Sequence, residues 1–271
     1  MGALCRQPFG LGRQPSGCGV RLLVLGTTKA FVSFLASLGW RPSAAPTHCL
    51  DSLLGSAAVP ICFDLDGTLG HFSSGFVLLR EALGELWGAT PTVEQLRLCR
   101  GSTDWEIVDD LHRMRFGRDL DEVGYAAYEV ACVERFRSTF APGGQQALRF
   151  EGVLEGLHRV AASRQVWLVS GNAPGLLAFK AEVLGVDPAI PRLGSLPRHD
   201  RTDLLKRALS GGPPPHLYVG DRPHDLAAAQ AAGMPFVGIG EAVPGPHRCL
   251  APEAEAEHLV AAVEAALLEH G

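Results

Sequence analysis

The chain has 271 residues, of which 46% are hydrophobic and 20% charged, as in an ordinary globular protein. Its net charge of −5 gives no basic surface of the kind that binds nucleic acid, so we expect no nucleic-acid partner. The seven cysteines form no CxxC pair and no Cys/His cluster at zinc spacing, which favours reduced thiols and a cytoplasmic protein.

Residues 1–56 contain no acidic residue before Asp51 but several basic ones. The basic residues are Arg6, Arg13, Arg21, Lys29 and Arg41. An Arg-rich, acid-free beginning is typical of a peptide that targets an organelle, and the alternative is a disordered extension unrelated to the chemistry. The apolar stretch 22–40 is interrupted by Lys29, which is costly inside a bilayer, so we expect no membrane span.

The first candidate for chemistry follows a short apolar run, where Asp64 and Asp66 are separated by one leucine and followed by Gly67. Residues i and i+2 of a strand point to the same side, so the two carboxylates should converge where the strand stops. Two anions at that distance repel unless a cation lies between them. The pattern indicates a metal-dependent site at a sheet edge, and the alternative is an Asp-Gly turn capped by Thr68.

Residues 73–140 carry hydrophobic residues at helical spacing in four segments. We expect these helices to begin at Ser73 or Ser74, at Thr92, at Ser102 or Thr103, and near Leu120. Pro142-Gly143-Gly144 then breaks the pattern and is typical of a hinge. The sequence therefore predicts an all-helical domain, residues 72–143, inserted into a core that consists of residues 57–71 and 144–271.

Helices and strands alternate after Gly144. Helices are expected at 152–163, 174–184, 202–209, 226–232 and 253–269, and strands at 165–169, 216–219 and 235–239. This alternation predicts an α/β protein with a Rossmann-like parallel sheet and helices on both faces.

Two of these strands end in polar residues. Ser170-Gly171-Asn172 lies just before a helix that begins at Pro174, where a hydroxyl and backbone N–H groups suit a phosphate oxygen; the alternative is a simple turn. Asp221 follows the strand 216–219 and can complete a Mg²⁺ site with Asp64. Asp225, four residues later, can fold back toward Asp221 or only cap the next helix.

A cation near this edge would offset the charge of a phosphate and of the aspartates. Arg201 lies at the start of the helix 202–209, whereas Lys206 lies more than one turn inside it. Because only the start of that helix borders the sheet edge, Arg201 is the preferred candidate over Lys206.

Taken in order, these stretches resemble the haloacid dehalogenase superfamily from Pro60 to about Glu269. Asp64-Leu65-Asp66-Gly67-Thr68-Leu69 matches the first motif, Ser170-Gly171-Asn172 the second, and Gly220-Asp221 with Asp225 the fourth. The helical insert resembles the cap of the phosphoglycolate phosphatase-like branch. The third motif departs from the family, since it is usually lysine and Arg201 stands at the best-matching position.

The resemblance implies that Asp64 is a nucleophile that forms an aspartyl-phosphate and that Asp66 is a general acid and base. Asp64, the backbone carbonyl of Asp66 and Asp221 would hold Mg²⁺. The residues Ser170, Gly171, Asn172 and Arg201 would bind the phosphoryl group. In the cap loop, Arg100, Thr103 and Asp104 are candidates for substrate contacts, although Thr103 and Asp104 equally fit a helix start.

The expected function is thus a Mg²⁺-dependent phosphatase acting on a small phosphorylated metabolite. The second aspartate, Asp66, favours a phosphate ester over a halide, because only an alkoxide leaving group needs a proton. The alternatives are a phosphomutase of the same branch and a non-catalytic regulatory protein on this scaffold. Neither the substrate nor the oligomeric state is indicated by the sequence.

Overall fold

The computed structural model describes residues 60–209, 216–241, 243 and 248–270, and the expectations for residues 1–56 lie outside these ranges. The chain divides into two units, and the second, Ser56–Gly271, contains all of the described residues. None of the helices in the described ranges is long and apolar enough to cross a membrane.

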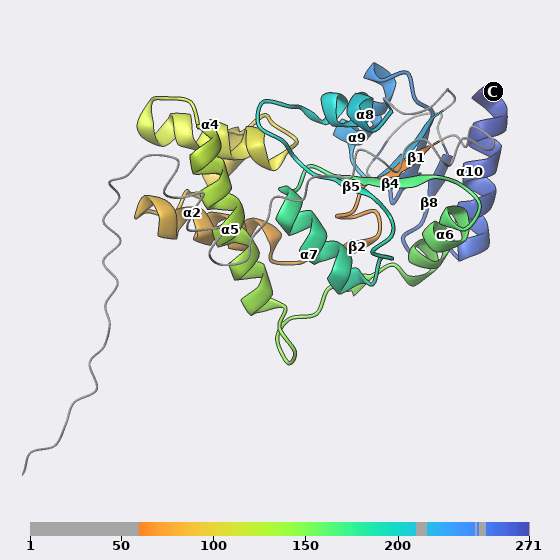
Figure 1. Cartoon of the computed structure of the whole chain (residues 1–271), viewed down its shortest axis with the longest axis horizontal. Coiled ribbons are helices and arrows are strands. Elements are labelled where there is room, and N and C mark those ends of the chain that lie inside the picture. Colours follow the sequence, from red (N-terminus) through yellow and green to blue (C-terminus); the bar gives the residue numbers. More distant parts are fainter. Residues whose placement is uncertain (1–59, 210–215, 242, 244–247, 271) are drawn as a thin grey trace, which may run out of the picture. The chain divides into compact units, whose positions relative to one another are not determined.

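The described elements alternate as the sequence predicts (Figure 1). The strands are β1 (Ile61–Phe63), β2 (Gly70–His71), β3 (Leu148–Arg149), β4 (Val166–Val169), β5 (Arg192–Leu193), β6 (Leu217–Gly220), β7 (Phe236–Ile239) and β8 (Arg248–Leu250). The helices are α2 (Gly75–Trp87), α3 (Val93–Leu98), α4 (Asp104–Phe116), α5 (Glu122–Thr139), α6 (Glu151–Ala161), α7 (Pro174–Leu184), α8 (Arg201–Leu209), α9 (Pro223–Ala231) and α10 (Ala256–His270).

Six of these strands form one parallel sheet in the order β5-β4-β1-β6-β7-β8. Strand β1 lies inside it, with Ile61 paired to Val166 on one side and to Leu217 on the other. All three residues of β1 are buried, as expected of a strand covered on both faces. The predicted α/β fold with a Rossmann-like parallel sheet is confirmed.

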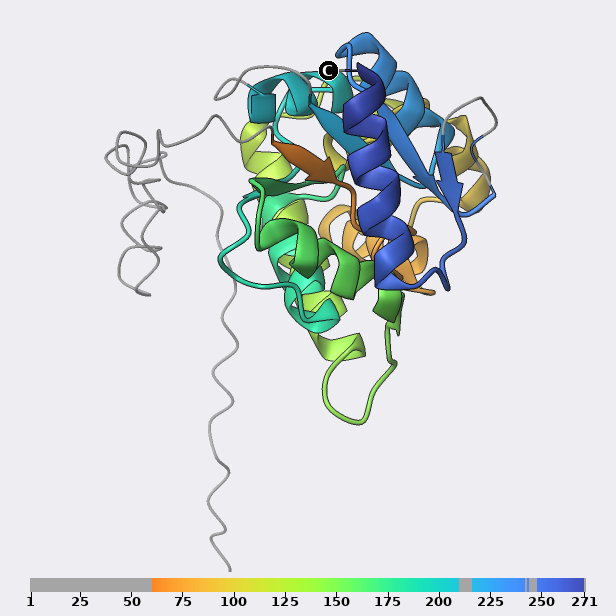
Figure 2. The same cartoon turned by 90° about the vertical axis from the view of Figure 1, so that its right-hand side faces the viewer.

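The two faces of the sheet have separate cores because side chains alternate along a strand. Ile61 and Phe63 pack with residues of α6, α7 and α10, whereas Cys62 packs with residues of α8 and α9 (Figures 1 and 2). Leucines, valines and alanines dominate both cores. This packing holds β1 rigidly, so the residues that follow it are placed with precision.

Helices α2 to α5 lie between β2 and β3 and form what we call the helical insert, residues 72–143, seen at the left of Figure 1. The predicted helix start at Thr92 is confirmed, since Thr92 and Gln95 form a capping box, and Thr103 caps α4 together with Glu106. Ser74 precedes α2 without a side-chain cap, since its hydroxyl donates to Gln145 at 2.7 Å. The separation of the insert from the core as a domain stays a prediction.

The chain enters and leaves the insert through two strands that pair with each other. Gly70 of β2 lies opposite Arg149 of β3 in an antiparallel ladder, and His71 lies opposite Leu148. The Phe150 N–H donates to the Leu69 carbonyl at 3.1 Å just beyond it. The two linkers therefore cross side by side at the base of the insert.

Candidate active site

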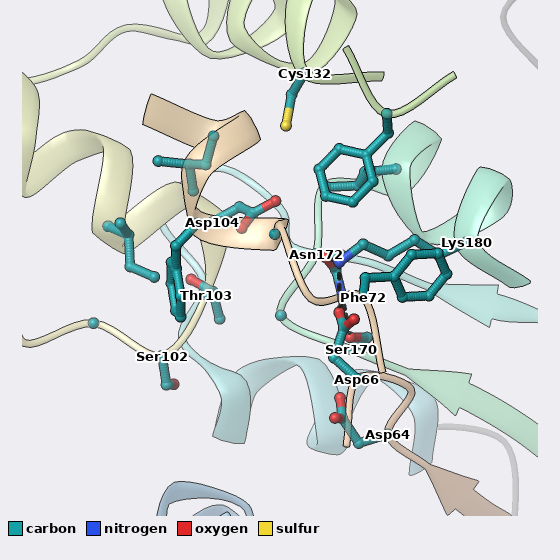
Figure 3. Close-up of a pocket in the computed structure, with 18 of the residues that line it drawn as sticks. Asp64, Asp66, Phe72, Ser102, Thr103, Asp104, Cys132, Ser170, Asn172 and Lys180 are labelled. Carbon is teal, nitrogen blue, oxygen red and sulfur yellow. Dashed lines mark hydrogen bonds and ion pairs between the residues drawn. The ribbon is translucent and has the colours of Figure 1, made fainter. Parts of the chain in front are cut away.

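A pocket of about 350 Å³ lies where the carboxyl ends of the parallel strands meet the helical insert. Figure 3 shows Asp64, Asp66, Ser170, Asn172 and Lys180 on the core side of this pocket. From the insert, Ser102, Thr103, Asp104 and Cys132 also line the pocket, and Phe72 lies beside Lys180 (Figure 3). The crevice outside the strand ends is where open α/β sheets bind their ligands.

Asp64 is the first residue after β1 and is only 4% exposed. Its backbone N–H donates to Val219 of the neighbouring strand at 2.9 Å, and its carboxylate accepts from the Arg201 guanidinium at 3.0 Å. Burial raises the pKa of Asp64 to about 8, and the nearby carboxylates add to the effect while Arg201 opposes it. A further cation would therefore be needed to keep Asp64 ionised at neutral pH.

Asp66 lines the same pocket but has different partners. Its Oδ2 accepts from the Asn172 amide at 2.7 Å and from the Lys180 ammonium at 2.7 Å. The Asp66 side chain is 34% exposed, so it can reach a bound substrate. The strand ends at Phe63, before either aspartate, so strand alternation does not explain how the two side chains are placed.

Three buried carboxylates, from Asp64, Asp221 and Asp225, offer ligand oxygens that all lie within 4.8 Å of one another. Gly67 makes room for this cluster, because a Cβ at that position would lie 2.1 Å from Asp221 Oδ2. Burial raises the pKa of Asp221 to about 6, with Asp225 adding to the effect. An all-oxygen, strongly anionic donor set fits Mg²⁺, so these residues are suited to hold that ion.

Asp225 has a larger role than the sequence indicated. It is completely buried and accepts from the backbone N–H groups of Asp221 and Arg222 at the start of α9, at 3.2 and 3.0 Å. It also forms a 2.8 Å ion pair with Arg201. Asp225 thus turns back toward Asp221 as expected, and the alternative that it only caps the helix is wrong.

Of the two cations considered for the third motif, Arg201 is buried and lines the pocket, whereas Lys206 is exposed farther along α8. Arg201 is the first residue of α8 and is 6% exposed. Its Nη1 contacts Asp64 and Asp225, while its Nη2 donates to the Ser102 carbonyl at 2.9 Å. One guanidinium therefore joins the carboxylate cluster to the helical insert.

The loop after β4 is held tightly against the insert. Ser170 is 2% exposed, and its hydroxyl accepts from the Asn172 amide at 2.9 Å. At Gly171 a Cβ would lie 2.5 Å from the Ser102 carbonyl oxygen and 2.6 Å from Arg201 Nη2. Only glycine allows the insert to approach this closely.

Lys180 was missed at the sequence level, although it contacts Asp66. It lies on α7 among Leu176, Leu177, Ala181 and Leu184, which are all buried, and is itself 4% exposed. Its Nζ also donates to Asn172 Oδ1 at 2.8 Å and lies 5.2 and 4.8 Å from the ring centroids of Phe72 and Phe136. The available signal was a lysine on the apolar face of a helix.

The candidate residues of the insert divide into two groups. Thr103 and Asp104 line the pocket, but the Thr103 hydroxyl caps α4 by accepting from Glu106 N, so the helix-start interpretation holds for it. The Asp104 carboxylate accepts from the Ala173 N–H at 2.8 Å, and burial raises its pKa to about 6. Arg100 is exposed and is not among the described residues that line the pocket.

One protein family matches most of the chain. The family model described as haloacid dehalogenase-like hydrolase matches residues 61–230. No curated protein matches the sequence of the chain.

Three solved structures illustrate the fold. A hydrolase from Pseudomonas syringae is 17% identical, with a TM-score of 0.57, and the match covers 74% of this chain and 97% of that one. CbbY from Rhodobacter sphaeroides in complex with phosphate is 19% identical, with a TM-score of 0.54 and coverage of 71% and 93%. A protein assigned provisionally as a beta-phosphoglucomutase, from Bacteroides vulgatus, is 18% identical, with a TM-score of 0.53 and coverage of 88% and 97%. At these identities the likeness shows the fold alone.

Proposed function

The chain belongs to the haloacid dehalogenase-like hydrolases, and on this basis we propose that it is a Mg²⁺-dependent phosphatase acting on a small phosphate monoester. The observation that carries the proposal is the convergence of Asp64, Asp221, Asp225 and Arg201 at one edge of the sheet. Positioning and charge neutralisation are the main requirements of phosphoryl transfer, and this arrangement offers both.

In the proposed reaction an Asp64 carboxylate oxygen attacks phosphorus, and the bond from phosphorus to the leaving oxygen breaks. Asp66 gives a proton to the departing alkoxide, which leaves as an alcohol. Asp66 then takes a proton from water, whose oxygen attacks the phosphorus of the aspartyl-phosphate, releasing inorganic phosphate and restoring Asp64. The overall change is one ester and one water converted to one alcohol and one phosphate.

The surrounding residues support these steps through charge and orientation. Arg201 and the loop Ser170-Gly171-Asn172 would bind the phosphoryl oxygens. Mg²⁺, held by Asp64, Asp221 and the Asp66 carbonyl, would offset phosphate charge. Lys180 and Asn172 orient Asp66 through the same carboxylate oxygen.

The presence of Asp66 supports an ester substrate over a halide, because an alkoxide leaving group requires a proton and a halide does not. A non-catalytic role is disfavoured, since it gives no reason to keep several repelling carboxylates buried together. A phosphomutase would return the phosphoryl group to a substrate and not to water, which the assay below distinguishes.

The test is release of inorganic phosphate by the full chain from a panel of phosphate monoesters, with Mg²⁺ or with EDTA. We expect turnover only with Mg²⁺, and a loss of about a thousandfold or more in Asp64→Asn, which removes the nucleophile. Circular dichroism of Asp64→Asn checks that the variant is folded. Undiminished turnover in this variant, or in EDTA, would overturn the proposal, and a requirement for a sugar bisphosphate activator would favour the mutase.

A further inference from the structure

The wall that the helical insert presents to the pocket is mostly apolar. It includes Phe76, Val77, Leu79 and Ile107, whereas Phe72 and Phe136 lie beside Lys180. The wall side chains come from the beginning of α2 and from α4. A wall of this kind favours burial of hydrophobic substrate atoms, at roughly 25 cal/mol for each Å² removed from water.

This wall also lacks positive charge. Among the described residues that line the pocket, those from the insert include no lysine, arginine or histidine. Asp104 is the one ionisable carboxyl group there. A second phosphate or a carboxylate on the leaving group would enter this wall without a cation to pair with and beside an acidic side chain, which is unfavourable in a partly desolvated site.

The cations on the core side are already engaged. Arg201 is paired with Asp64 and Asp225, and Arg222 with Asp221 at 2.9 Å. Lys180 directs Nζ at Asp66 and Asn172, with the rings of Phe72 and Phe136 beside it. Each of these cations is therefore paired at the catalytic end of the pocket and not at the apolar wall of the insert.

Two histidines also line the core side. His224 lies beside the carboxylate cluster, with Nε2 at 3.7 Å from Asp225 Oδ1. His71 is exposed on β2, outside the insert.

The mouth of the pocket continues the apolar wall. Phe76 and Val77, in the first turn of α2, are 61% and 50% exposed and line the pocket. Such exposed hydrophobic side chains at a cavity rim are suited to cover the outer part of a hydrophobic ligand.

We propose that the preferred substrate is a phosphate monoester of an apolar, uncharged alcohol, without a second anionic group. This inference rests on the phosphatase activity proposed above and narrows its substrate class. A sugar bisphosphate or a phosphorylated carboxylic acid would be disfavoured, because each carries a second anionic group and the described insert residues that line the pocket offer it no cation.

The test compares benzyl phosphate with 4-carboxybenzyl phosphate, which differ chiefly by one negative charge. The full chain is assayed with Mg²⁺, and kcat/KM is measured for both esters. We expect benzyl phosphate to be preferred by about tenfold or more, since one unpaired charge must be placed against an apolar wall.

Two matched variants test whether the preference for benzyl phosphate depends on the charge at the pocket. Val77→Lys places an ammonium at the pocket mouth, and we expect it to reduce the preference several-fold. Val130→Lys makes the same change at a valine of α5 that is 59% exposed and does not line the pocket, and it should leave the ratio unchanged. Both positions are exposed, so both variants are expected to fold.

A ratio near one, a preference for the carboxylated ester, or an unchanged ratio in Val77→Lys would overturn the inference. Hydrolysis of neither ester would also overturn it. The wider monoester panel then separates the two failures, because turnover of any other ester leaves the phosphatase proposal standing, whereas no turnover of any ester ends both.

Discussion

Lys180 is the residue that adds most to the expected chemistry. It is a buried cation whose main partner, Asp66, is the proposed acid and base, and it reaches the site from α7, which the motifs left unexamined. Lys180 and Asn172 both bind Oδ2 of Asp66, which leaves the other carboxylate oxygen available to a substrate. We regard Lys180 as a positioning residue for Asp66.

Lys180→Met should lower kcat by about ten- to a hundredfold with a smaller change in KM, because Asp66 loses an oriented partner while the phosphate-binding residues remain. Lys180→Arg should restore part of kcat, since it returns the charge. Steady-state kinetics on any ester that the chain hydrolyses measures this.

Lys206→Met on the exposed part of α8 is the matched control and should retain activity within about twofold, as surface changes usually do. If both lysine variants behaved alike, the ion pair between Lys180 and Asp66 would have no catalytic role.

At the residue scale, the candidate site residues that directly follow strands could be predicted from the sequence. Asp64, Ser170 and Asp221 each come directly after a buried strand, and parallel strands end at one edge. Lys180 could not be found in this way, because its place depends on how α7 packs against the insert. The choice of Arg201 over Lys206 followed from helix geometry and agrees with their burial.

At the scale of elements, the beginning of α4 is hydrogen-bonded to the segment that begins α7. The Asp104 N–H donates to the Gly171 carbonyl at 2.6 Å, and the Asp104 carboxylate accepts from the Ala173 N–H. The next residue, Trp105, donates its N–H to the Ser195 hydroxyl at 3.0 Å. A carboxylate beside the start of α7 also interacts favourably with the helix dipole.

Asp104 makes stability depend on pH. Its pKa in the folded chain is raised from 3.8 to about 6, chiefly by burial, so the protonated form is favoured by folding. The stabilisation is complete below pH 4 and is lost as the pH rises to about 6, by up to about 3 kcal/mol. Asp104→Asn should lack this loss.

Thermal unfolding of the two proteins between pH 4 and 7 measures the effect. The melting temperature of the wild type, relative to Asp104→Asn, should fall as the pH rises through this window. If the melting temperatures of the two proteins changed in parallel with pH, Asp104 would not titrate in the folded chain over this range.

Helices and long strands were predictable because their signals are local. Caps such as Thr92 with Gln95, and Pro174 at the first turn of α7, gave boundaries close to those observed. The strands β5 and β8 were not predicted, because they are two and three residues long and carry Arg192 and Arg248. Their formation depends on an existing sheet edge.

At the scale of the whole molecule, the carboxylates that are proposed to hold Mg²⁺ lower the stability of the metal-free chain. Asp64, Asp221 and Asp225 repel one another in a buried site that Arg201 offsets only in part. Folding must hold these charges together before any ion binds, so the metal-free chain is less stable than its packing alone would make it.

Asp221→Asn should therefore raise the melting temperature of the metal-free protein by about 2–4 °C, the equivalent of about 1 kcal/mol, while abolishing Mg²⁺-dependent phosphate release. In the wild type, Mg²⁺ at ten times its Kd should stabilise by about 1.4 kcal/mol, and the variant should lose most of this gain. Differential scanning calorimetry with Mg²⁺ or EDTA measures both.

Glu182→Gln, at an exposed position of α7, neutralises a carboxylate outside the cluster and serves as the control, with both effects expected to be absent. A Mg²⁺-induced rise that persisted in full in Asp221→Asn would place the ion elsewhere.

The pairing of strands β2 and β3 affects how readily the helical insert between them could be replaced by another segment. Whatever polypeptide lies between His71 and Leu148 is closed at its base by one short ladder. The entropic cost of closing a loop grows only slowly with its length. The length of the inserted segment should therefore have little effect on the stability of the sheet. We expect that another segment in its place would change which phosphate ester the chain prefers, if it preserved the contacts of Ser102 with Arg201 and of Asp104 with Ala173.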